Sequence, residues 1–408
     1  MNQNKAIGLL SIPVMVAALG YFVDIYDLLL FGMIRNTSLK SLGLTGDEVV
    51  KVGLNVMSIQ MYGLLIGGII WGVMGDKKGR LSVLFGSIIL YSLANIVNGL
   101  VQTVQQYNIC RFIAGVGLAG ELGAGITLVS ELIPKEKRGV ATSLVAGIGL
   151  TGAIAAYFIS KVFDWRTCFY IGGGLGLMLL LLRVSVFESG MYHKVKESKV
   201  QKGNFFMFFT NAKRFKKYLL AILIGLPTWY VIGLLIQVSD KFGKEFGIRD
   251  EIIPGKSVMF AYCAISVADV LIGLVSQALK SRKKALYIYY AITIISIVLY
   301  FQQKDGSASS MYAICALMGF GTGFWALFVT MAAEHFGTNL RATAATTVPN
   351  MVRGSLPLII FLFKDILQPG FSFIQAGAIT GIIVMTISTF AVFMTEETFG
   401  KDLNFVEE

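Results

Sequence analysis

The stretch Gly72-Val-Met-Gly-Asp76-Lys77-Lys78-Gly79-Arg80 is a short run of glycines and charges between two long apolar segments. These segments, at about 50–74 and 81–101, are each long enough to cross the ~30 Å hydrocarbon core of a bilayer as a helix. The glycines permit a tight turn and close helix approach, while the carboxylate and the cations can pair and respond to helix dipoles. The stretch therefore predicts two membrane-spanning helices joined by a tight, charged connection.

The composition of the whole chain agrees with a membrane protein. Of its 408 residues, 55% are hydrophobic and 14% are charged, whereas a soluble domain typically carries about 25% charged residues. The apolar residues fall in long blocks, such as 141–160, and buried helices of a soluble protein would show shorter, amphipathic blocks. Twelve spanning helices are predicted, at about 11–34, 50–74, 81–101, 106–132, 138–162, 166–187, 218–238, 257–279, 285–301, 311–332, 343–363 and 372–394.

The distribution of positive charge predicts how the chain is oriented. An even number of spans places both termini on one side of the membrane, and most Lys and Arg residues fall in the loops of that side. Because cytoplasmic loops carry an excess of Lys and Arg, this side is predicted to be cytoplasmic. The net charge of +11 is therefore interpreted as a topology signal, and no nucleic-acid partner is expected.

The two halves of the chain resemble each other. Three features recur, in order, at an offset of about half the chain: Gly72 and Gly273, Gly115-Val-Gly117 and Gly319-Phe-Gly321, and Glu131 with Arg138 against Glu334 with Arg341. Such a parallel repeat is typical of two similar bundles that face a central cavity. We therefore expect an all-α membrane protein with an N-terminal six-helix bundle (1–187), a basic cytoplasmic linker (188–217) and a C-terminal six-helix bundle (218–408).

These motifs resemble those of a known family. The stretch 72–80 resembles the signature between helices two and three of the major facilitator superfamily, and Arg111 with the following glycines resembles its fourth-helix motif. Gly120-Glu121 and the stretch 131–139 are similar to the metabolite:proton symporter group, and Glu397-Thr398 to the sugar porters. The resemblance implies alternating access and a set of gating residues: Gly72, Asp76, Gly79, Arg80, Glu131, Arg138, Glu334 and Arg341.

Charges inside the membrane are the best candidates for function, because each costs several kcal/mol unless it is paired or hydrated. Seven fall within the predicted helices. We expect Arg183, close to the cytoplasmic end of its helix, to extend toward the membrane surface and to be structural. The seven are Asp24, Asp27, Arg111, Glu121, Arg183, Asp269 and Arg353.

Asp27 and Arg111 are predicted to lie at the same depth. At 1.5 Å per residue, Asp27 lies about 10 Å from the outer end of its helix and Arg111 about 8 Å from the same surface. In the symporters that this chain resembles, an aspartate of helix one and this arginine of helix four form the proton-coupling pair. The resemblance implies that Asp27 takes the proton; a static buried ion pair is the alternative. Asp24 shares a helix face with Asp27, and it either joins the coupling or serves a local network.

Asp269 and Arg353 are predicted near the membrane midplane, where substrates of such carriers usually sit. They either bind opposite charges of one solute or neutralise each other. Glu121 lies deeper, within the symporter-like motif. The acids outnumber the arginines, which leans toward a cationic or zwitterionic solute, although Arg353 can hold a carboxylate. Further pocket candidates, for each of which packing is the simpler interpretation, are Tyr26, Gln60, Gln237, Trp325 and Asn350.

The pattern as a whole favours a secondary transporter, most simply a proton-coupled symporter of a small polar organic solute such as a zwitterion, a carboxylate or a sugar. No phosphate-binding loop is present for direct use of ATP. The intramembrane segments hold no serine–histidine constellation, and the cysteines lack metal-ligand spacing, so no enzyme, metal or cofactor is predicted. A uniporter, an antiporter and a transport-like receptor remain as alternatives. We expect a monomer in a bacterial inner membrane.

Overall fold

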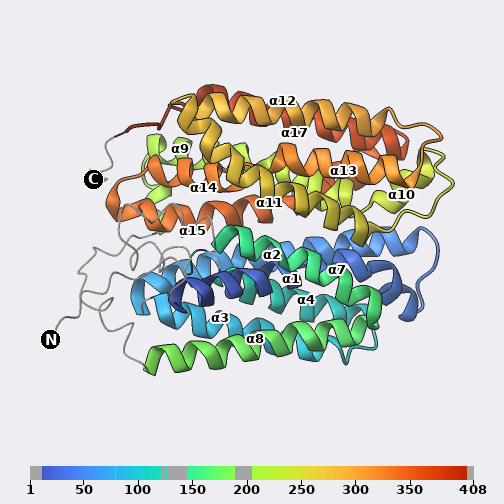
Figure 1. Cartoon of the computed structure of the whole chain (residues 1–408), viewed down its shortest axis with the longest axis horizontal. Helices are drawn as coiled ribbons and strands as arrows, with labels where there is room; N and C mark the ends of the chain where they lie inside the picture. Colours follow the sequence, from blue (N-terminus) through green and yellow to red (C-terminus); the bar gives the residue numbers. More distant parts are fainter. Residues whose placement is uncertain are drawn as a thin grey trace.

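The computed structural model describes residues 12–78, 80–121, 123, 125, 145–188 and 205–401, and within them every regular element is a helix. The helices form two groups that lie side by side, one from each half of the chain (Figure 1). α1 begins and α17 ends toward the same end of the molecule (Figure 1). The first group comprises α1 Ile12–Ser41, α2 Glu48–Lys78, α3 Arg80–Asn98, α4 Val104–Leu118, α7 Gly152–Val162 and α8 Trp165–Glu188.

Among the described residues, the second group has more helix interruptions than the first. Two of its elements, η3 and η4, are π-helical turns, and η2 is a short 3-10 helix. Its elements are η2 Phe205–Phe209, α9 Ala212–Trp229, η3 Tyr230–Ile236, α10 Ser239–Glu245, α11 Pro254–Ala278, α12 Arg282–Phe301, α13 Ala308–Thr322, α14 Trp325–Glu334, α15 Thr338–Gly354, α16 Leu356–Phe361, η4 Leu362–Leu367 and α17 Phe373–Met394.

The outer surface of the helices is apolar, as a bilayer requires. In the described part of the chain, ten helices are long and apolar enough to cross a membrane, and Ser82–Asn98 is a shorter apolar helix. Large hydrophobic side chains are exposed along them; Leu181 of α8 is 70% exposed and Phe393 of α17 is 69% exposed. Since soluble monomers rarely expose such extensive apolar surface, this is a multi-pass membrane protein.

The Gly-x-Gly repeats place equivalent helices at the centre of each group. A Cβ atom on Gly115 would overlap the Gln60 carbonyl of α2, and one on Gly117 would overlap the backbone of α3. In the second half, Gly319 lies in the same way against α11 and Gly321 against α12. α4 and α13 therefore each pack tightly between two neighbours, and the sequence repeat corresponds to a repeat of helix packing.

Several helix boundaries differ from the predicted ones, for local physical reasons. α1 runs on to Ser41, whereas its apolar pattern ends near 34. α9 begins at Ala212 and not near 218, because the Asn211 side chain caps it by accepting hydrogen bonds from two backbone N–H groups of its first turn. Pro227 lies within α9 just before the π-turn η3, and Pro357 lies in the first turn of α16. Proline removes a backbone donor, so such interruptions are expected near it.

Candidate functional site

Arg111 and Asp27 form an ion pair inside the first group of helices. Arg111 Nη1 lies 3.3 Å from Asp27 Oδ1, and both side chains are fully buried. The guanidinium also donates to the amide oxygens of Asn95 and, at 3.4 Å, Asn98, both on α3. Its carbon lies 4.5 Å from the ring centroid of Phe169 on α8. Arg111 thus contacts side chains of α1, α3 and α8. Its pairing with Asp27 agrees with the equal depths predicted from the sequence.

Asp24 and Arg353 lie across the boundary between the two groups. Arg353 Nη2 of α15 is 3.9 Å from Asp24 Oδ2 of α1, and neither side chain is more than 2% exposed. Within the described residues, neither Asp24 oxygen has a hydrogen-bond partner, and neither does Arg353 Nε. Arg353 donates only a long 3.4 Å bond to Asn350 and lies 5.8 Å from the Trp325 ring centroid. This pair is buried and loosely held.

Asp269 and Arg353 do not pair with each other in this structure, so of the two alternatives mutual neutralisation is wrong, and binding of one solute stays a prediction. Asp269 Oδ1 accepts a 2.7 Å hydrogen bond from the backbone N–H of Ala326, in the first turn of α14. α13 and α14 are one apolar segment broken at Gly323, and the break leaves the amide groups of α14 without helical partners. Asp269 supplies one of those partners, while the carboxylate beside Arg353 is Asp24.

Glu121 is also paired, with an arginine that was expected elsewhere. Arg183 does not extend to the membrane surface: it is 4% exposed and binds both carboxylate oxygens of Glu121, with 3.1 Å from Nη1 to Oε2. Ser87 adds a 3.3 Å hydrogen bond to Glu121, and Arg183 Nη1 donates to the Leu84 carbonyl at 3.2 Å. Two opposite charges at similar depth neutralise each other, which costs less than exposing one of them to lipid.

The amide and aromatic candidates separate into those at the boundary and those that pack elsewhere. Tyr26 donates a 2.9 Å hydrogen bond to the Cys168 carbonyl, within the first group. Asn350 crosses the boundary, because its amide donates to the Ala119 carbonyl of the first group at 2.9 Å. Gln60 and Trp325 are the two whose side-chain nitrogens are buried with no partner in the described structure.

Opposed buried charges on two similar helix groups suit the movement of a polar solute between the groups. The family model of the Major Facilitator Superfamily matches residues 17–360. The chain belongs to the major facilitator superfamily. It is a transporter and not an enzyme, and among its described residues no group of three His, Cys, Asp or Glu side chains could hold a metal ion.

The relatives of this transporter are carriers of small metabolites. It is 26% identical over 95% of its length to a putative metabolite transport protein of Haemophilus influenzae, covering 96% of that protein. It is 26% identical over 95% of its length to the niacin transporter NiaP of Acinetobacter baylyi, covering 94% of it. It is 25% identical over 94% of its length to the cis,cis-muconate transport protein of the same organism, covering 95% of it.

The gating motif of this transporter is described only in part. Gly79, Glu131 and Arg138, and the side chains of Asp76 and Arg80, lie outside the described structure. Gly72 of α2 faces the Thr347 side chain of α15. Arg341 lies in the first turns of α15.

The second copy of the motif does form a described ionic network at the end of α14. Glu334 pairs with Arg282 of α12 at 3.0 Å and accepts a 2.7 Å hydrogen bond from Thr398. Glu397, beside Thr398, accepts hydrogen bonds from Ser281 and from the backbone N–H groups of the first turn of α12. These bonds outweigh partial burial and lower the pKa of Glu397 to about 2. The tail after α17 is thereby fixed to α12 and α14.

One polar contact between the groups escaped the sequence analysis. At the opposite end from the Glu334 network, the buried Arg35 of α1 donates to the Gln237 carbonyl at 2.8 Å and to both oxygens of Asp240 at 2.6 and 2.7 Å. Asn36 donates to the same carboxylate at 2.8 Å. We call this contact, formed by Arg35, Asn36, Gln237 and Asp240, the seal. In this contact Gln237 lies away from Arg353, with which it was predicted to share a pocket. The sequence signal for the contact was the pair of opposite charges, Arg35 and Asp240, at the ends of two predicted helices.

Proposed function

We propose that this transporter is a proton-coupled symporter of a small organic acid, working by alternating access. The observation that carries the proposal is Arg353: a buried arginine at the boundary between the helix groups, whose only charged neighbour in the described structure is 3.9 Å away. A guanidinium is the group best suited to bind a carboxylate in two parallel hydrogen bonds. Here one of its nitrogens has no partner.

The surroundings of Arg353 suit an acid with a flat, unsaturated body. Trp325 offers both a ring face and an indole N–H without a described partner, whereas the Asn350 amide already donates to two backbone carbonyls. Niacin and cis,cis-muconate, named in two relatives, are both unsaturated molecules with carboxyl groups. This favours a carboxylate over the cation that the excess of acids suggested. Asp269 and Glu121 already have local partners, so fewer acids remain for a cation.

Coupling to protons is assigned to Asp27, with Asp24 in support. Neutralising Asp27 leaves Arg111 with two amide oxygens and an aromatic face, so the arginine stays solvated when the carboxylate takes a proton. Asp27 Oδ2 is buried without a described hydrogen-bond partner, which leaves room for a proton there. Neutralising Asp24 would remove the charge that competes with a substrate carboxylate for Arg353. A proton and an acid bound together therefore leave less uncompensated charge inside the membrane than either does alone.

The architecture proposed for this cycle is two six-helix bundles, 1–187 and 218–408, joined by the basic linker 188–217, with twelve helices in all. The family match and the side-by-side helix groups support it (Figure 1). The positive-inside bias supports cytoplasmic termini, and bacterial relatives support a bacterial inner membrane. Because both helix groups and the candidate site belong to one chain, a monomer suffices.

The test is uptake of labelled acids into proteoliposomes that contain the full-length protein. Benzoate, niacin and muconate are compared with an amino acid, a betaine and a sugar, with and without an inward proton gradient. We expect accumulation of an acid that depends on the gradient, about tenfold per pH unit for one proton per substrate. Entry that ignores the gradient would make the protein a uniporter, and gradient-dependent uptake of a cation instead would refute the role given to Arg353.

A further inference from the structure

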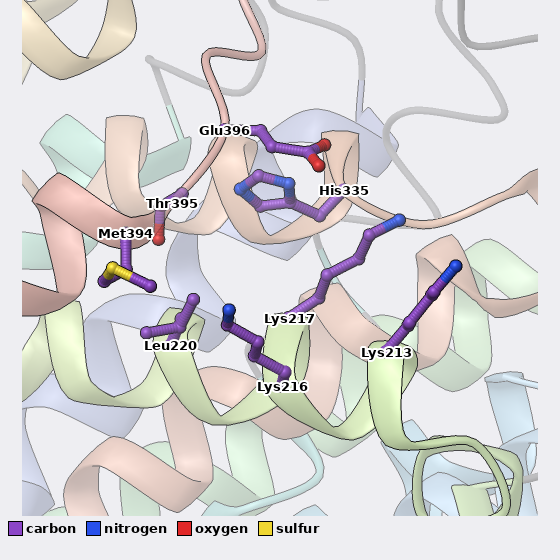
Figure 2. Close-up of a pocket in the computed structure, with 8 residues that line it drawn as sticks. All are labelled: Lys213, Lys216, Lys217, Leu220, His335, Met394, Thr395 and Glu396. Atoms are coloured by element: carbon purple, nitrogen blue, oxygen red, sulfur yellow. The ribbon is translucent and has the colours of Figure 1, made fainter.

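A cavity lies away from the Asp24–Arg353 boundary, at the end of the molecule that carries the Glu334 network. It has a volume of about 210 Å³, well above the ~10–15 Å³ that one water molecule needs. Its walls come from the first turns of α9, the end of α14 and the end of α17 (Figure 2). The residues that line it are Lys213, Lys216, Lys217, Leu220, His335, Met394, Thr395 and Glu396.

Three lysines of one helix face dominate this cavity. Lys213, Lys216 and Lys217 are spaced i, i+3 and i+4, which places them on one side of α9. None of the three has an ion-pair partner in the described structure. The one acid of the wall, Glu396, lies 3.8 Å from Lys401. Three cations on one helix face give this cavity a positive potential, which a bound anion would partly neutralise.

His335 is the second, independent sign of a ligand. Its side chain lies in the cavity wall beside Glu396 and Lys217 (Figure 2), and the residue is only 3% exposed. Neither ring nitrogen has a hydrogen-bond partner in the described part of the chain, although buried polar atoms are nearly always satisfied. Burial, and then the charges of Lys401 and Lys217, lower the pKa of His335 to about 4. At neutral pH the ring is therefore uncharged and carries one N–H donor.

We propose that this cavity binds a phosphate group, through the lysines of α9 and the ring N–H of His335. Lysine is a common phosphate ligand, and the several oxygens of a phosphate can meet several lysines at once. The group can be carried by an anionic phospholipid or by a soluble phosphorylated compound. The apolar wall favours the lipid: Leu220 and Met394 line the cavity, and Phe393, the neighbour of Met394 in the sequence, is 69% exposed. Basic pockets between helices on the cytoplasmic side are known to hold lipid headgroups.

The test measures lipid retention and needs no transport assay. The full-length protein is purified in micelles containing equal phosphatidylglycerol and phosphatidylcholine, and the lipids that stay bound are counted by native mass spectrometry. The wild type is compared with Lys216→Gln/Lys217→Gln. The control is Lys280→Gln/Lys284→Gln, which removes two exposed, unpaired lysines from the connection and first turn of α12 at the same end of the molecule. Lys216, Lys280 and Lys284 are exposed and Lys217 is half-buried, so both variants are expected to fold.

We expect the wild type to retain phosphatidylglycerol over phosphatidylcholine. The Lys216/Lys217 variant should lose about tenfold or more of that retention, at roughly fivefold per lysine, and the control should change less than twofold. His335→Gln, which keeps an N–H donor, should bind better than His335→Leu. The proposal would be overturned if the two lysine variants lost equal amounts of phosphatidylglycerol retention. It would also be overturned if the wild type retained both lipids equally and a soluble phosphate had no effect.

A second arm separates the two sources of the phosphate. In lipid-free detergent, inorganic pyrophosphate at millimolar concentration is added and the melting temperature is measured. If pyrophosphate raises it for the wild type and for the Lys280/Lys284 control but not for the Lys216/Lys217 variant, the site also takes soluble phosphates. If only phosphatidylglycerol distinguishes the variants, the ligand is the lipid headgroup.

Discussion

The two buried Asp–Arg pairs of this transporter differ in how firmly they are held. Arg111 meets Asp27 within one helix group and has two amide acceptors and an aromatic ring besides. Arg353 meets Asp24 across the boundary between groups, at a longer distance and with few other contacts. A pair within one group can persist while the groups move, whereas a pair across the boundary changes whenever they separate. In the function proposed above, the first pair carries the proton and the second binds the substrate.

The largest effect is expected from Asp27→Asn. This substitution removes the proposed proton acceptor, so gradient-driven accumulation should fall from about tenfold per pH unit to none, while exchange of internal for external acid continues. Proteoliposome uptake and counterflow measure the two activities. The matched variant Asp24→Asn should keep coupling and lower the KM, because it frees Arg353 for the substrate. Accumulation by Asp27→Asn at the wild-type level would show that the firm pair is only structural.

The next largest effect is expected from Arg353→Gln. Removing one partner of a buried charge contact typically costs 2–5 kcal/mol, so the KM for the acid should rise about 30-fold or more. Arg353→Lys should recover part of the loss, because it restores the charge without the two-pronged geometry. In contrast, Arg111→Gln should reduce folded protein in the membrane, since it leaves Asp27 uncompensated. An unchanged KM in Arg353→Gln would place the substrate elsewhere.

A moderate effect is expected from Asp240→Asn, which weakens the seal. The reporter is a cysteine placed at Gln60, a residue 1% exposed, in a background that lacks the exposed Cys263. Labelling by an impermeant maleimide from outside should become about tenfold faster, because a broken seal lets the groups separate at that end. The Asp24–Arg353 contact would loosen with it, and the Asp27–Arg111 pair would not. Unchanged labelling would mean that other contacts hold the groups together.

The Asp240 carboxylate of the seal should stay charged from neutral to mildly acidic pH, so the seal should remain intact over that range. Burial alone would raise the pKa of Asp240, but the charge and hydrogen bonds of Arg35, with the bond from Asn36, outweigh it and lower the pKa below its usual value. A lowered pKa in the folded state stabilises the contact above the usual pKa of an aspartate, and that stabilisation is lost only as the pH falls through the lowered value. Labelling of the reporter cysteine should therefore stay slow from neutral to mildly acidic pH.

The smallest effect is expected from Lys241→Gln, beside the seal. Lys241 lies 2.8 Å from Asp47, but the Asp47 side chain is 86% exposed, and exposed ion pairs contribute only about 0–1 kcal/mol. Labelling of the same reporter should change less than about threefold, and added salt should abolish the difference. An effect as large as that of Asp240→Asn would show that net charge at this end, and not the buried seal, holds the groups together.

The family and the general plan of the molecule were predictable from sequence, because they depend on repeated and local signals. The Gly-x-Gly repeats depend on close backbone approach, which fixes the residue type. The family match confirmed the resemblance that the 72–80 motif indicated. The contact between Asp27 and Arg111 was predictable from depth, because the rise of 1.5 Å per residue alone gives the depth of each side chain. These features need no knowledge of which helix faces which.

The partners of the other charges could not be predicted, because they depend on helix rotation and on breaks within helices. Arg183 turns inward to Glu121, which its distance from the helix end does not reveal. Asp269 accepts a hydrogen bond from the first turn of α14 only because the helix breaks at Gly323. The sequence predicted one continuous apolar helix there. Arg35 was missed because α1 extends beyond its apolar pattern to Ser41.

The break between α13 and α14 has a mechanical consequence. α14 is a short rod of ten residues, about 15 Å long, with Trp325 at one end and Glu334 at the other. Because its first turn is already separated from α13 and bonded to Asp269, tilting the rod ruptures no hydrogen bond of a continuous helix. A solute bound at Arg353 that displaced Trp325 would therefore tilt α14 as one unit. The tilt would move Glu334, about 15 Å away, relative to Arg282.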